Sequence, residues 1–493
     1  MGKEQLKHFK MRATALDVFF KKNKDRKTVV IQGLGFVGAA MLTAVARATD
    51  SNNKPLYAVI GTDLPNAGGM NKIDCINEGK LPFKCSDQFL QRVFTKCFRQ
   101  GNIIATCDKR AYKVADILVV DINLDVKKKG LKNSSKNKVF FSNFVKAMRQ
   151  AAKLVKPSCL IIIESTVPPG TCEKVLLPIF KLEFKNRGYL RRSVDLVHSY
   201  ERVMPGRNYL NSIISYFRVF SGINKKAKKK AREFFESFID AKKYPLAELE
   251  NTTASEIGKV LENSFRAINI ALIQEWTEFA EAAGVDLYKV LDAIRKRETH
   301  RNIMNPGFGV GGYCLTKDSI IADFGLRNLF RKRRRLAMSL NAVNVNDKMP
   351  FHSFSILTKQ LGKLKDKTVL IMGVSYLKDI SDTRNSPSEI FYRICARQEA
   401  KVLAHDPLVE YWPEMKIKVS NDLSELRKNK ADAVIFAVNH DSYLKLRPVV
   451  FAEFLKPKAF ILDANNVIND RKSSALRKMG YRLLGVGKGH WKF

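Results

Sequence analysis

The sequence predicts an α/β protein with two Rossmann-like, doubly wound parallel sheets, joined by a helical central domain with one long helix. Three observations lead to this fold class. Apolar runs of strand length alternate with amphipathic runs of helix length toward both ends of the chain, as in βαβ units. A glycine-rich turn follows the first of these runs. Between the two sheets, the apolar residues of 252–284 roughly follow a helical period.

The domain boundaries are placed where these patterns change. A chain of 493 residues is long enough for about three domains of ~150 residues each. We predict a basic leader at 1–27, a first Rossmann-like domain at 28–212, a central helical domain at 213–345 and a C-terminal Rossmann-like domain at 346–493.

The leader contains only the short apolar patch "LDVFF", which is too short for the core of a signal peptide. No apolar run in the sequence reaches the ~18 residues that a membrane span needs. We therefore expect a cytoplasmic protein with no membrane span.

Cysteine usage and charge limit the possible partners. The eight cysteines are scattered and form no C-x-x-C pair, so we expect neither a metal site nor a disulfide framework. The 87 Lys+Arg exceed the 48 Asp+Glu, which gives +39, and the excess gathers at 125–138, 225–232 and 330–335. Such runs attract anionic partners or form a solvated surface. Because aromatic residues do not alternate with them, we expect no nucleic-acid partner.

The first unit opens with a buried strand at Val29–Gln32, a glycine turn and a helix at Phe36–Ala46. A second strand, "LYAVIGTD", ends at Asp63. The apolar runs "ADILVVDI", "CLIIIEST" and "VDLVHS" then alternate with helical patterns such as "FSNFVKAMRQAAKLV". This alternation predicts a parallel sheet with right-handed crossovers.

The turn "GLGFVG" has the G-x-G-x-x-G spacing between a strand and a helix. Gly33 permits the turn, Gly35 lets the backbone approach a pyrophosphate, and Gly38 permits close packing of helix on strand. Asp63, at the end of the next strand, is placed to hold a ribose diol and would repel a 2′-phosphate. The pattern therefore predicts NAD, in preference to NADP.

The central segment is helical. The pattern predicts a long helix ending near Gly284, a plausible C-cap, which is long enough to join two domains and carry a dimer interface. Lys259 and Asn263 lie at i and i+4 on one face of it. Alone, such a pair is more typical of a solvated helix surface. A cation and an amide on one face also suit a developing oxyanion.

The third unit begins near Leu364 and is again βαβ. "KTVLIMGVSY" is a strand that runs into a turn, "SPSEIFYRICARQ" is a helix, and "AKVLAHDP" is a strand that ends at Asp406. Its turn carries only Gly373, where the first unit has three glycines. The second sheet is therefore expected to bind a different ligand.

The stretch "NPGFGVGGYCLTKD", residues 305–318, crowds four glycines around Cys314 and places Asp318 four residues later. Glycines allow a close approach of the main chain and positive φ. A cysteine in this setting is either a nucleophile or a small buried apolar residue.

Six segments, in this order, resemble the UDP-glucose/GDP-mannose dehydrogenase family of nucleotide-sugar 6-dehydrogenases: "GLGFVG", "IESTVPPGT", "SYERVMPG", "ASEIGKVLENSFRAINIA", "PGFGVGGYCLTKD" and "GVSYLKDISDTRNSP". The resemblance runs from about Thr28 to Asp470. It implies a NAD domain, a helical dimerising linker and a UDP-binding C-terminal domain. The forms "ERVMPG" and "GVGGYC" are more similar to the branch that acts on UDP-N-acetylhexosamines than to the UDP-glucose branch.

The resemblance implies that Cys314 is a nucleophile. It would trap the C6 aldehyde as a thiohemiacetal, which is oxidised to a thioester and hydrolysed, so that an alcohol becomes a carboxylate in a four-electron oxidation. Lys259 and Asn263 match oxyanion-stabilising residues, Asp318 matches a carboxylate that orders a water, and Glu201 matches the glutamate of thioester hydrolysis. An adjacent ammonium such as that of Lys259 favours the thiolate.

The same resemblance implies the ligand contacts. Those with the cofactor are Gly33, Gly35, Phe36, Val37, Gly38, Asp63, Thr166 and Arg384. Those with the substrate are Glu201, Lys259, Asn263, Phe308, Gly309, Gly311 and Lys378.

The sequence departs from the family pattern at three places. "DINLDV" stands where many members have a threonine-proline-threonine turn, so the threonine that serves the catalytic water has no counterpart. Pro205 replaces an acidic residue that many members place four after the hydrolytic glutamate. Asn465 stands where an arginine is common, so the nucleotide contact of that arginine is left unassigned.

The sequence thus predicts a NAD-dependent UDP-sugar 6-dehydrogenase, a homodimer or higher homo-oligomer, that supplies uronic acids for polysaccharide. Two alternatives stay open at this point. One is the same enzyme acting on GDP-mannose. The other is a non-catalytic nucleotide-sugar or nucleic-acid binding protein on the same scaffold, which the net charge of +39 motivates. Arg295, Arg297 and Arg301 are candidates to reach across a dimer.

Overall fold

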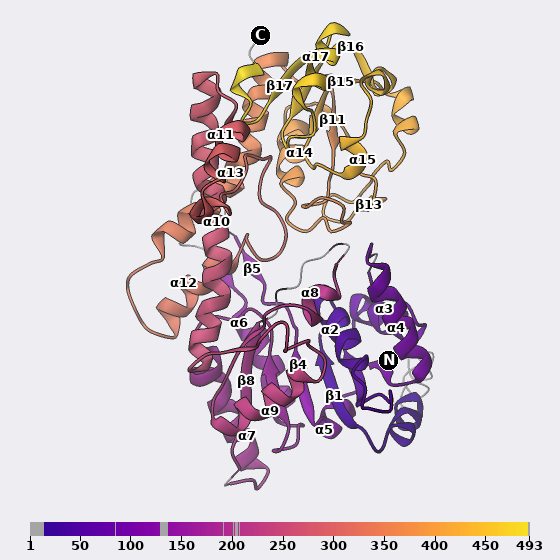
Figure 1. Cartoon of the computed structure of the whole chain (residues 1–493), viewed down its shortest axis with the longest axis vertical. Coiled ribbons are helices and arrows are strands. Elements are labelled where there is room, and N and C mark those ends of the chain that lie inside the picture. Colours follow the sequence, from indigo (N-terminus) through magenta and orange to yellow (C-terminus); the bar gives the residue numbers. More distant parts are fainter. Residues whose placement is uncertain are drawn as a thin grey trace. The chain divides into compact units, whose positions relative to one another are not determined.

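The computed structural model describes residues 14–83, 85–128, 137–190, 192–200, 202, 206 and 208–491. Within that part the chain forms two compact units (Figure 1). Of the described residues, the first unit contains 14–127, 138–260 and 321–335, and the second contains 128, 137, 261–320 and 336–491. Each unit is built around one sheet. No helix in the described part is both long and apolar enough to cross a membrane.

The sheet of the first unit has eight strands in the order β10-β9-β8-β7-β4-β1-β2-β3. All neighbours are parallel except β8 and β9. Strand order reverses beside β1, which is where ligands bind in open α/β sheets. The strands are β1 Lys27–Gln32, β2 Tyr57–Thr62, β3 Ile103–Thr106, β4 Ile117–Val120, β7 Leu160–Ile163, β8 Asp195–Tyr200, β9 Val219–Gly222 and β10 Ala247–Glu248, with a separate ribbon of β5 Val126–Lys127 and β6 Lys138–Val139.

Apolar faces of three helices, α2, α4 and α9, contribute to one core with β1 and β2. Helix α2 has the bounds that the sequence pattern predicts, because the glycine turn before it and the apolar run "FVGAAMLTAVA" define both ends. The helices are α2 Phe36–Ala46, α3 Ala67–Asn77, α4 Gln88–Gln100, α5 Arg110–Val114, α6 Phe141–Ala152, the π-helix η2 Cys172–Leu176, α7 Leu177–Asn186, α8 Asn211–Ile214 and α9 Lys225–Glu236.

The sheet of the second unit has five parallel strands in the order β12-β11-β15-β16-β17. This confirms the predicted second βαβ fold. The strands are β11 Thr368–Met372, β12 Lys401–His405, β15 Ala431–Phe436, β16 Leu455–Asp463 and β17 Arg482–Gly485, with a ribbon of β13 Tyr411–Trp412 and β14 Ile417–Lys418. The helices are α14 Pro387–Arg397, η4 Leu423–Lys428, α15 Asp441–Leu444, η5 Pro448–Val450, α16 Phe451–Phe454, α17 Asp470–Lys478 and η6 Gly489–Trp491.

The long helix α10, Thr252–Ala283, begins in the first unit and continues in the second. Asn251 caps its start by accepting from Ala254 N at 2.9 Å. At its end Gly284 has φ +74° and Val285 N donates to Ala280 O at 2.8 Å, as in a Schellman motif, which confirms the predicted C-cap. The other helices of this segment are α11 Leu287–Ile294, η3 Glu298–His300, α12 Asp318–Asn328 and α13 Ala337–Leu361.

Two basic runs are partly neutralised within the first unit. On α9, Lys226 and Lys230 pair with the buried Asp195 at 3.5 and 2.7 Å. Lys228 and Arg232 pair with Glu248 at 3.3 and 2.9 Å.

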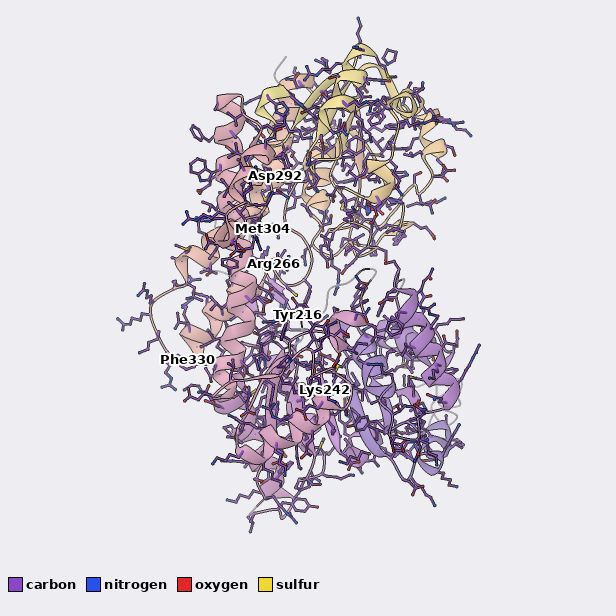
Figure 2. The ribbon with its side chains drawn as sticks, viewed as in Figure 1. Tyr216, Lys242, Arg266, Asp292, Met304 and Phe330 are labelled. Atoms are coloured by element: carbon purple, nitrogen blue, oxygen red, sulfur yellow. The ribbon has the colours of Figure 1, made fainter. Side chains whose placement is uncertain are left out.

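The run at 330–335 lies in the loop between α12 and α13, where Figure 2 shows Phe330. The ring of Phe330 lies under Lys174 Nζ at 4.8 Å, and Arg335 pairs with Asp323 at 2.9 Å. Part of the charge excess therefore stabilises the fold itself.

A buried ion pair supports the carboxyl ends of the strands in the first unit. Arg218 is 4% exposed and donates to the buried Glu164 directly after β7, and to Ser199 Oγ on β8 at 2.9 Å. Its guanidinium also lies over the ring of Phe235 at 4.7 Å. The pair therefore joins two strand ends and the core beneath them.

We expect Arg218→Met to lower the free energy of unfolding by about 3–5 kcal/mol, because it removes the guanidinium from a buried carboxylate. Urea denaturation of the full chain measures this. Arg232→Met, which removes a half-exposed pair, should cost less than about 1 kcal/mol. The double variant Glu164→Gln with Arg218→Met should recover part of the loss. Equal effects of the two single variants would contradict the assignment.

Candidate active site

The glycine turn after β1 leaves room for a ligand at one glycine and none at the other two. Gly33 has φ +101°, and an added Cβ would lie 2.6 Å from Asp121 O. A Cβ on Gly38 would lie 1.8 Å from Gly33 O. At Gly35, the first residue before α2, a Cβ would meet nothing within 4 Å. The open position is the one that the motif assigns to the pyrophosphate, at the positive end of a helix.

Asp63 is fixed beside this turn. Its Oδ2 accepts from Leu34 N at 2.9 Å and pairs with Lys72 Nζ at 3.0 Å. Its Oδ1 accepts from Leu64 N at 2.8 Å, and the side chain is 11% exposed. Phe36 and Val37 are partly buried in the first turn of α2, and Phe36 stacks on Phe83 with 4.7 Å between ring centroids. These residues fit a nicotinamide dinucleotide.

The segment "DINLDV" packs against the same turn. Asp121 N donates to Gln32 O at 2.8 Å. Ile122 O accepts from Ser165 Oγ at 2.7 Å. Thr166 follows Ser165 and is partly exposed. The turn that lacks the family threonine therefore lies at the carboxyl end of β4, beside the residues expected to contact NAD.

Lys259 lies on the second turn of α10 and is 9% exposed. Its ammonium is 5.7 Å from the centroid of the Tyr200 ring, at the end of β8. Burial lowers the pKa of His198 to about 3, and the charge of Lys259 acts in the same direction. This imidazole is therefore neutral. Glu201, the predicted hydrolytic residue, and Pro205 lie outside the described residues.

The glycines before Cys314 are required by packing within the second unit. A Cβ on Gly309 would lie 2.5 Å from Pro387, at the first position of α14. Those on Gly311 and Gly312 would lie 2.5 and 2.7 Å from Tyr376. The loop therefore lies flat on the turn after β11, which explains the crowding of glycine.

Phe308, predicted to contact the substrate, is 1% exposed in the core of the second sheet. Its ring packs on that of Phe391 with centroids 5.4 Å apart. Only its backbone is available to a ligand.

Cys314 is exposed, whereas the other seven cysteines are buried or partly buried. Its carbonyl accepts from Lys317 N and Asp318 N at 3.1 and 3.0 Å, which places it directly before α12. The buried Asp318 accepts from Asn263 Nδ2 through Oδ2 at 2.6 Å. A backbone hydrogen bond thus joins Cys314 to Asp318, and a side-chain hydrogen bond joins Asp318 to Asn263.

Lys317 was not among the predicted residues. It is 5% exposed, with Nζ 4.0 Å from the ring centroid of Tyr313 and 3.7 Å from Asp318 Oδ1. Its position between the cysteine and the aspartate in "CLTKD" is the only sequence signal that pointed to it.

Arg384 is held beside the same loop. It donates to both carboxylate oxygens of Asp382, with the shortest contact at 2.6 Å, and lies over the Tyr313 ring at 5.4 Å. Burial alone would lower the pKa of Arg384, but the bonds to Asp382 outweigh it and raise the pKa. Burial also raises the pKa of Tyr376 to about 12, with Asp382 and Cys314 acting in the same direction.

Lys378 lies in the loop after β11 and pairs with Asp441 at 2.6 Å. The loop is fixed by the buried His440, whose Nδ1 accepts from Asp379 N at 3.0 Å. The ring proton is therefore on Nε2, which lies 3.2 Å from both Asp406 Oδ2 and Ser375 Oγ. A nitrogen that carries its proton is no base for Ser375, so this serine, histidine and aspartate are structural.

Asp406 follows the second strand of its βαβ unit, as Asp63 does, but its side chain is less exposed to solvent. Its Oδ2 accepts from Val374 N and Ser375 N at 2.9 and 3.0 Å, and the side chain is fully buried. Burial acts to raise the pKa of Asp406, but the bond from His440 and the backbone N–H groups outweigh it and lower the pKa. The carboxylate of Asp406 is therefore closed to a ribose diol.

Two further residues form hydrogen bonds with nearby segments of the second unit. They are Asn465, at the position where an arginine is common, and Arg295, a candidate to reach across a dimer. Asn465 donates through Nδ2 to Ala437 O at 2.6 Å. Arg295 donates to Ile303 O at 2.9 Å and to Asn305 Oδ1 at 2.5 Å, so it fixes the segment that leads into the glycine loop. Arg297 and Arg301 are exposed.

Comparison with known proteins gives three matches to models of one family, described as the UDP-glucose/GDP-mannose dehydrogenase family. Its NAD binding domain matches residues 27–239, its central domain 253–347 and its UDP binding domain 370–470. A UDP-N-acetyl-D-mannosamine dehydrogenase from Methanococcus aeolicus is 28% identical over 477 residues, which cover 95% of this chain and 97% of that protein.

Solved structures resemble the whole chain. An NDP-N-acetyl-D-galactosaminuronic acid dehydrogenase from Methanosarcina mazei has a TM-score of 0.74 at 28% identity, covering 97% of this chain and 99% of that one. A UDP-D-ManNAc dehydrogenase from Pyrococcus horikoshii has a TM-score of 0.76 at 26% identity, covering 94% and 100%.

The glycine turn allows a matched pair of substitutions. We expect Gly35→Ala to fold normally but to weaken NAD binding by at least ~10-fold, because the methyl group occupies the space left for the pyrophosphate. Gly38→Ala should lower the free energy of unfolding by about 1–3 kcal/mol through overpacking. Quenching of protein fluorescence by NAD and urea denaturation measure the two effects. Normal NAD affinity in a folded Gly35→Ala variant would contradict the assignment of this turn.

Proposed function

Because this chain belongs to the UDP-glucose/GDP-mannose dehydrogenase family, whose members are NAD-dependent nucleotide-sugar dehydrogenases, we propose that it oxidises the C6 alcohol of a UDP-N-acetylhexosamine to the carboxylate. The observation that carries the proposal is the group formed by the exposed Cys314 and the Asn263–Asp318 hydrogen bond. A protein that only binds a nucleotide sugar has no need of an exposed thiol four residues before a buried carboxylate.

The overall reaction converts one alcohol, two NAD and one water into one carboxylate, two NADH and the released protons. NAD, when bound, supplies the electron acceptor for both oxidations. The residues that would hold it are those of the glycine turn and Asp63. The substrate's UDP group is assigned to the second sheet, on the strength of the matched UDP binding domain.

The chain's own residues carry the other steps. Asp318 orders a water that takes the hydroxyl proton, and its bond to Asn263 fixes the direction of both side chains. The Cys314 thiolate then adds to the C6 aldehyde, forming a C–S bond and an oxyanion. Lys259, one turn from Asn263 on α10, supplies positive charge for that oxyanion. After the second oxidation water displaces Cys314 from the thioester, which restores the thiol.

The choice of sugar follows from the relatives rather than from a measured contact. The three relatives named above act on N-acetylated sugars, according to their names. We therefore place UDP-N-acetylmannosamine and UDP-N-acetylgalactosamine before UDP-glucose and GDP-mannose.

We also propose that the protein is a homodimer built on α10. Six large apolar side chains on this helix are 45–63% exposed: Ile257, Leu261, Phe265, Leu272, Trp276 and Phe279. At 100° per residue they fall within about 100° of arc, so they form one continuous stripe along the helix. A stripe of this width on a single face is typical of a helix that packs against an equivalent helix.

The substrate is tested with a panel of nucleotide sugars, in which NADH absorbance is compared with sugar consumed. We expect two NADH per sugar, with the highest kcat/KM for a UDP-N-acetylhexosamine. Cys314→Ala should reduce steady NADH formation by at least ~10³-fold, because the thioester route is lost. Cys75→Ala, at a partly buried thiol, is the matched control. Steady turnover by Cys314→Ala, or one NADH per sugar, would rule out the proposed route.

The dimer is tested by light scattering after size-exclusion chromatography. We expect the double variant Leu272→Glu with Phe279→Glu to be monomeric, because it places two carboxylates in the apolar stripe. Leu182→Glu on α7, where the side chain is 53% exposed, removes a comparable apolar group from another surface and should leave the mass unchanged. A wild-type monomer, or a double variant with unchanged mass, would refute this assembly.

A further inference from the structure

We infer that Glu256 is a positioning residue that couples the turn after β7 to the catalytic helix. This inference rests on the role proposed above for Lys259. Glu256 lies three residues before Lys259 on α10 and is fully buried. It does not belong to the predicted catalytic set.

The carboxylate of Glu256 caps a neighbouring element and not its own helix. Its Oε2 accepts from Gly170 N at 2.6 Å, and its Oε1 accepts from Cys172 N at 2.8 Å. Both donors are at the start of η2, where backbone N–H groups lack partners within the helix. A buried carboxylate that accepts two N–H groups in this way holds the two elements at a fixed distance.

A second carboxylate joins the same two elements, but it belongs to η2 and binds the start of α10. Glu173 of η2 accepts from Thr252 Oγ1 and Thr253 Oγ1 at 3.3 Å each, at the start of α10. Each of the two helix starts is thus held by an acid from the other. This arrangement fixes both the separation and the rotation of the first two turns of α10.

Other buried polar contacts secure the same turns from the neighbouring strands. Ser255 Oγ lies 2.7 Å from Nδ1 of His198 on β8 and 2.5 Å from Oγ of Ser221 on β9. The part of α10 that carries Ser255 and Glu256 is therefore anchored to β8, β9 and the start of η2. Lys259 extends from the turn that follows.

Glu256 binds the turn at Gly170, which is four residues after Thr166, a residue expected to contact NAD. A movement of this turn would therefore displace a residue expected to contact NAD. A movement of α10 would displace the ammonium group of Lys259. Because Glu256 joins the two, its loss should reduce kcat through misplacement of Lys259. A displacement of about 1 Å at a reacting group lowers the rate about 10- to 100-fold.

Protonation of Glu256 should make kcat depend on pH, which allows the positioning role to be tested. Burial raises the pKa of Glu256 to about 7, whereas the N–H groups of Cys172 and Gly170 and the Cys172 thiol act in the opposite direction. The titratable groups that face it from η2 are the Cys172 thiol and the Glu173 carboxylate. Protonation turns one of the two acceptor oxygens into a donor that faces an N–H group. We therefore expect kcat to rise as the pH rises through about 7.

The contribution of Glu256 to the free energy of unfolding should fall as the pH rises, whereas kcat should rise. Since its pKa is raised, the folded protein binds this proton more tightly than the unfolded chain does. The stabilising contribution is complete at low pH and is lost as the pH rises through about 7. At pH 8, Glu256→Gln removes an ionised buried group and keeps one acceptor oxygen, so the melting temperature should not fall.

The experiment measures kcat, KM and melting temperature of the full-length protein between pH 6 and 9, for wild type and Glu256→Gln. We expect the variant to lose about 10- to 100-fold in kcat at pH 8 with an unchanged melting temperature, and its rate limb near pH 7 to disappear. The exposed Glu250→Gln, directly before α10, is the matched control and should behave as wild type. If Glu256→Gln lowered the melting temperature together with kcat, the role of Glu256 would be structural only, and the inference would be overturned.

A double-mutant cycle with Lys259→Ala separates this inference from the proposed function. If Glu256 acts through Lys259, adding Glu256→Gln to Lys259→Ala should cause no further loss in kcat. Additive losses would overturn the inference and leave the role of Lys259 intact. Full activity of Lys259→Ala would instead refute the proposed role of the lysine, whatever Glu256→Gln does.

Discussion

Close approach of the main chain, at distances where no side chain fits, organises both the cofactor turn and the cysteine loop. At Gly38 an added Cβ would lie 1.8 Å from a carbonyl oxygen, and at Gly311 it would lie 2.5 Å from Tyr376. Such contacts hold the backbone in one arrangement because any displacement creates a clash or a void. The exposed Cys314 and the helix start at Phe36 take their positions from these two turns. Gly35, with open space around it, is the exception that leaves room for a ligand.

The two sheets share one construction and differ in what they leave accessible. In each, a glycine with φ +101° follows the first strand of the βαβ unit, and an acid after the next strand accepts from the N–H groups of that turn. The Asp63 side chain is 11% exposed, whereas Asp406 is fully buried and is covered by two N–H groups and His440. In addition, the cysteine loop packs on Pro387, at the helix start where a dinucleotide phosphate would otherwise bind. These differences explain how one fold serves two ligands in the same chain.

Charge has two separate uses in this protein. Much of the excess on α9 is paired with Asp195 and Glu248, so it stabilises the first unit. Buried charges, in contrast, lie where the chain needs fixed directions: Arg218 with Glu164, and Glu256 with two N–H groups. A net charge of +39 by itself therefore says little about partners.

The sequence by itself determined the fold class, the bounds of the first helix of the cofactor turn, the C-cap of the long helix, and the family. These follow from local patterns, since a glycine turn, a helical period or a strand-length apolar run is complete within a few consecutive residues. Only the tertiary structure decided that Phe308 belongs to the core, that Lys317 lies against Tyr313, and that Glu256 binds a turn 84 to 86 residues away. The physical reason is that burial and hydrogen-bond partners depend on which distant segments pack together. The sequence marks a residue such as Glu256 as one more acid on a helix, and its function depends on the two N–H groups that the fold places opposite it.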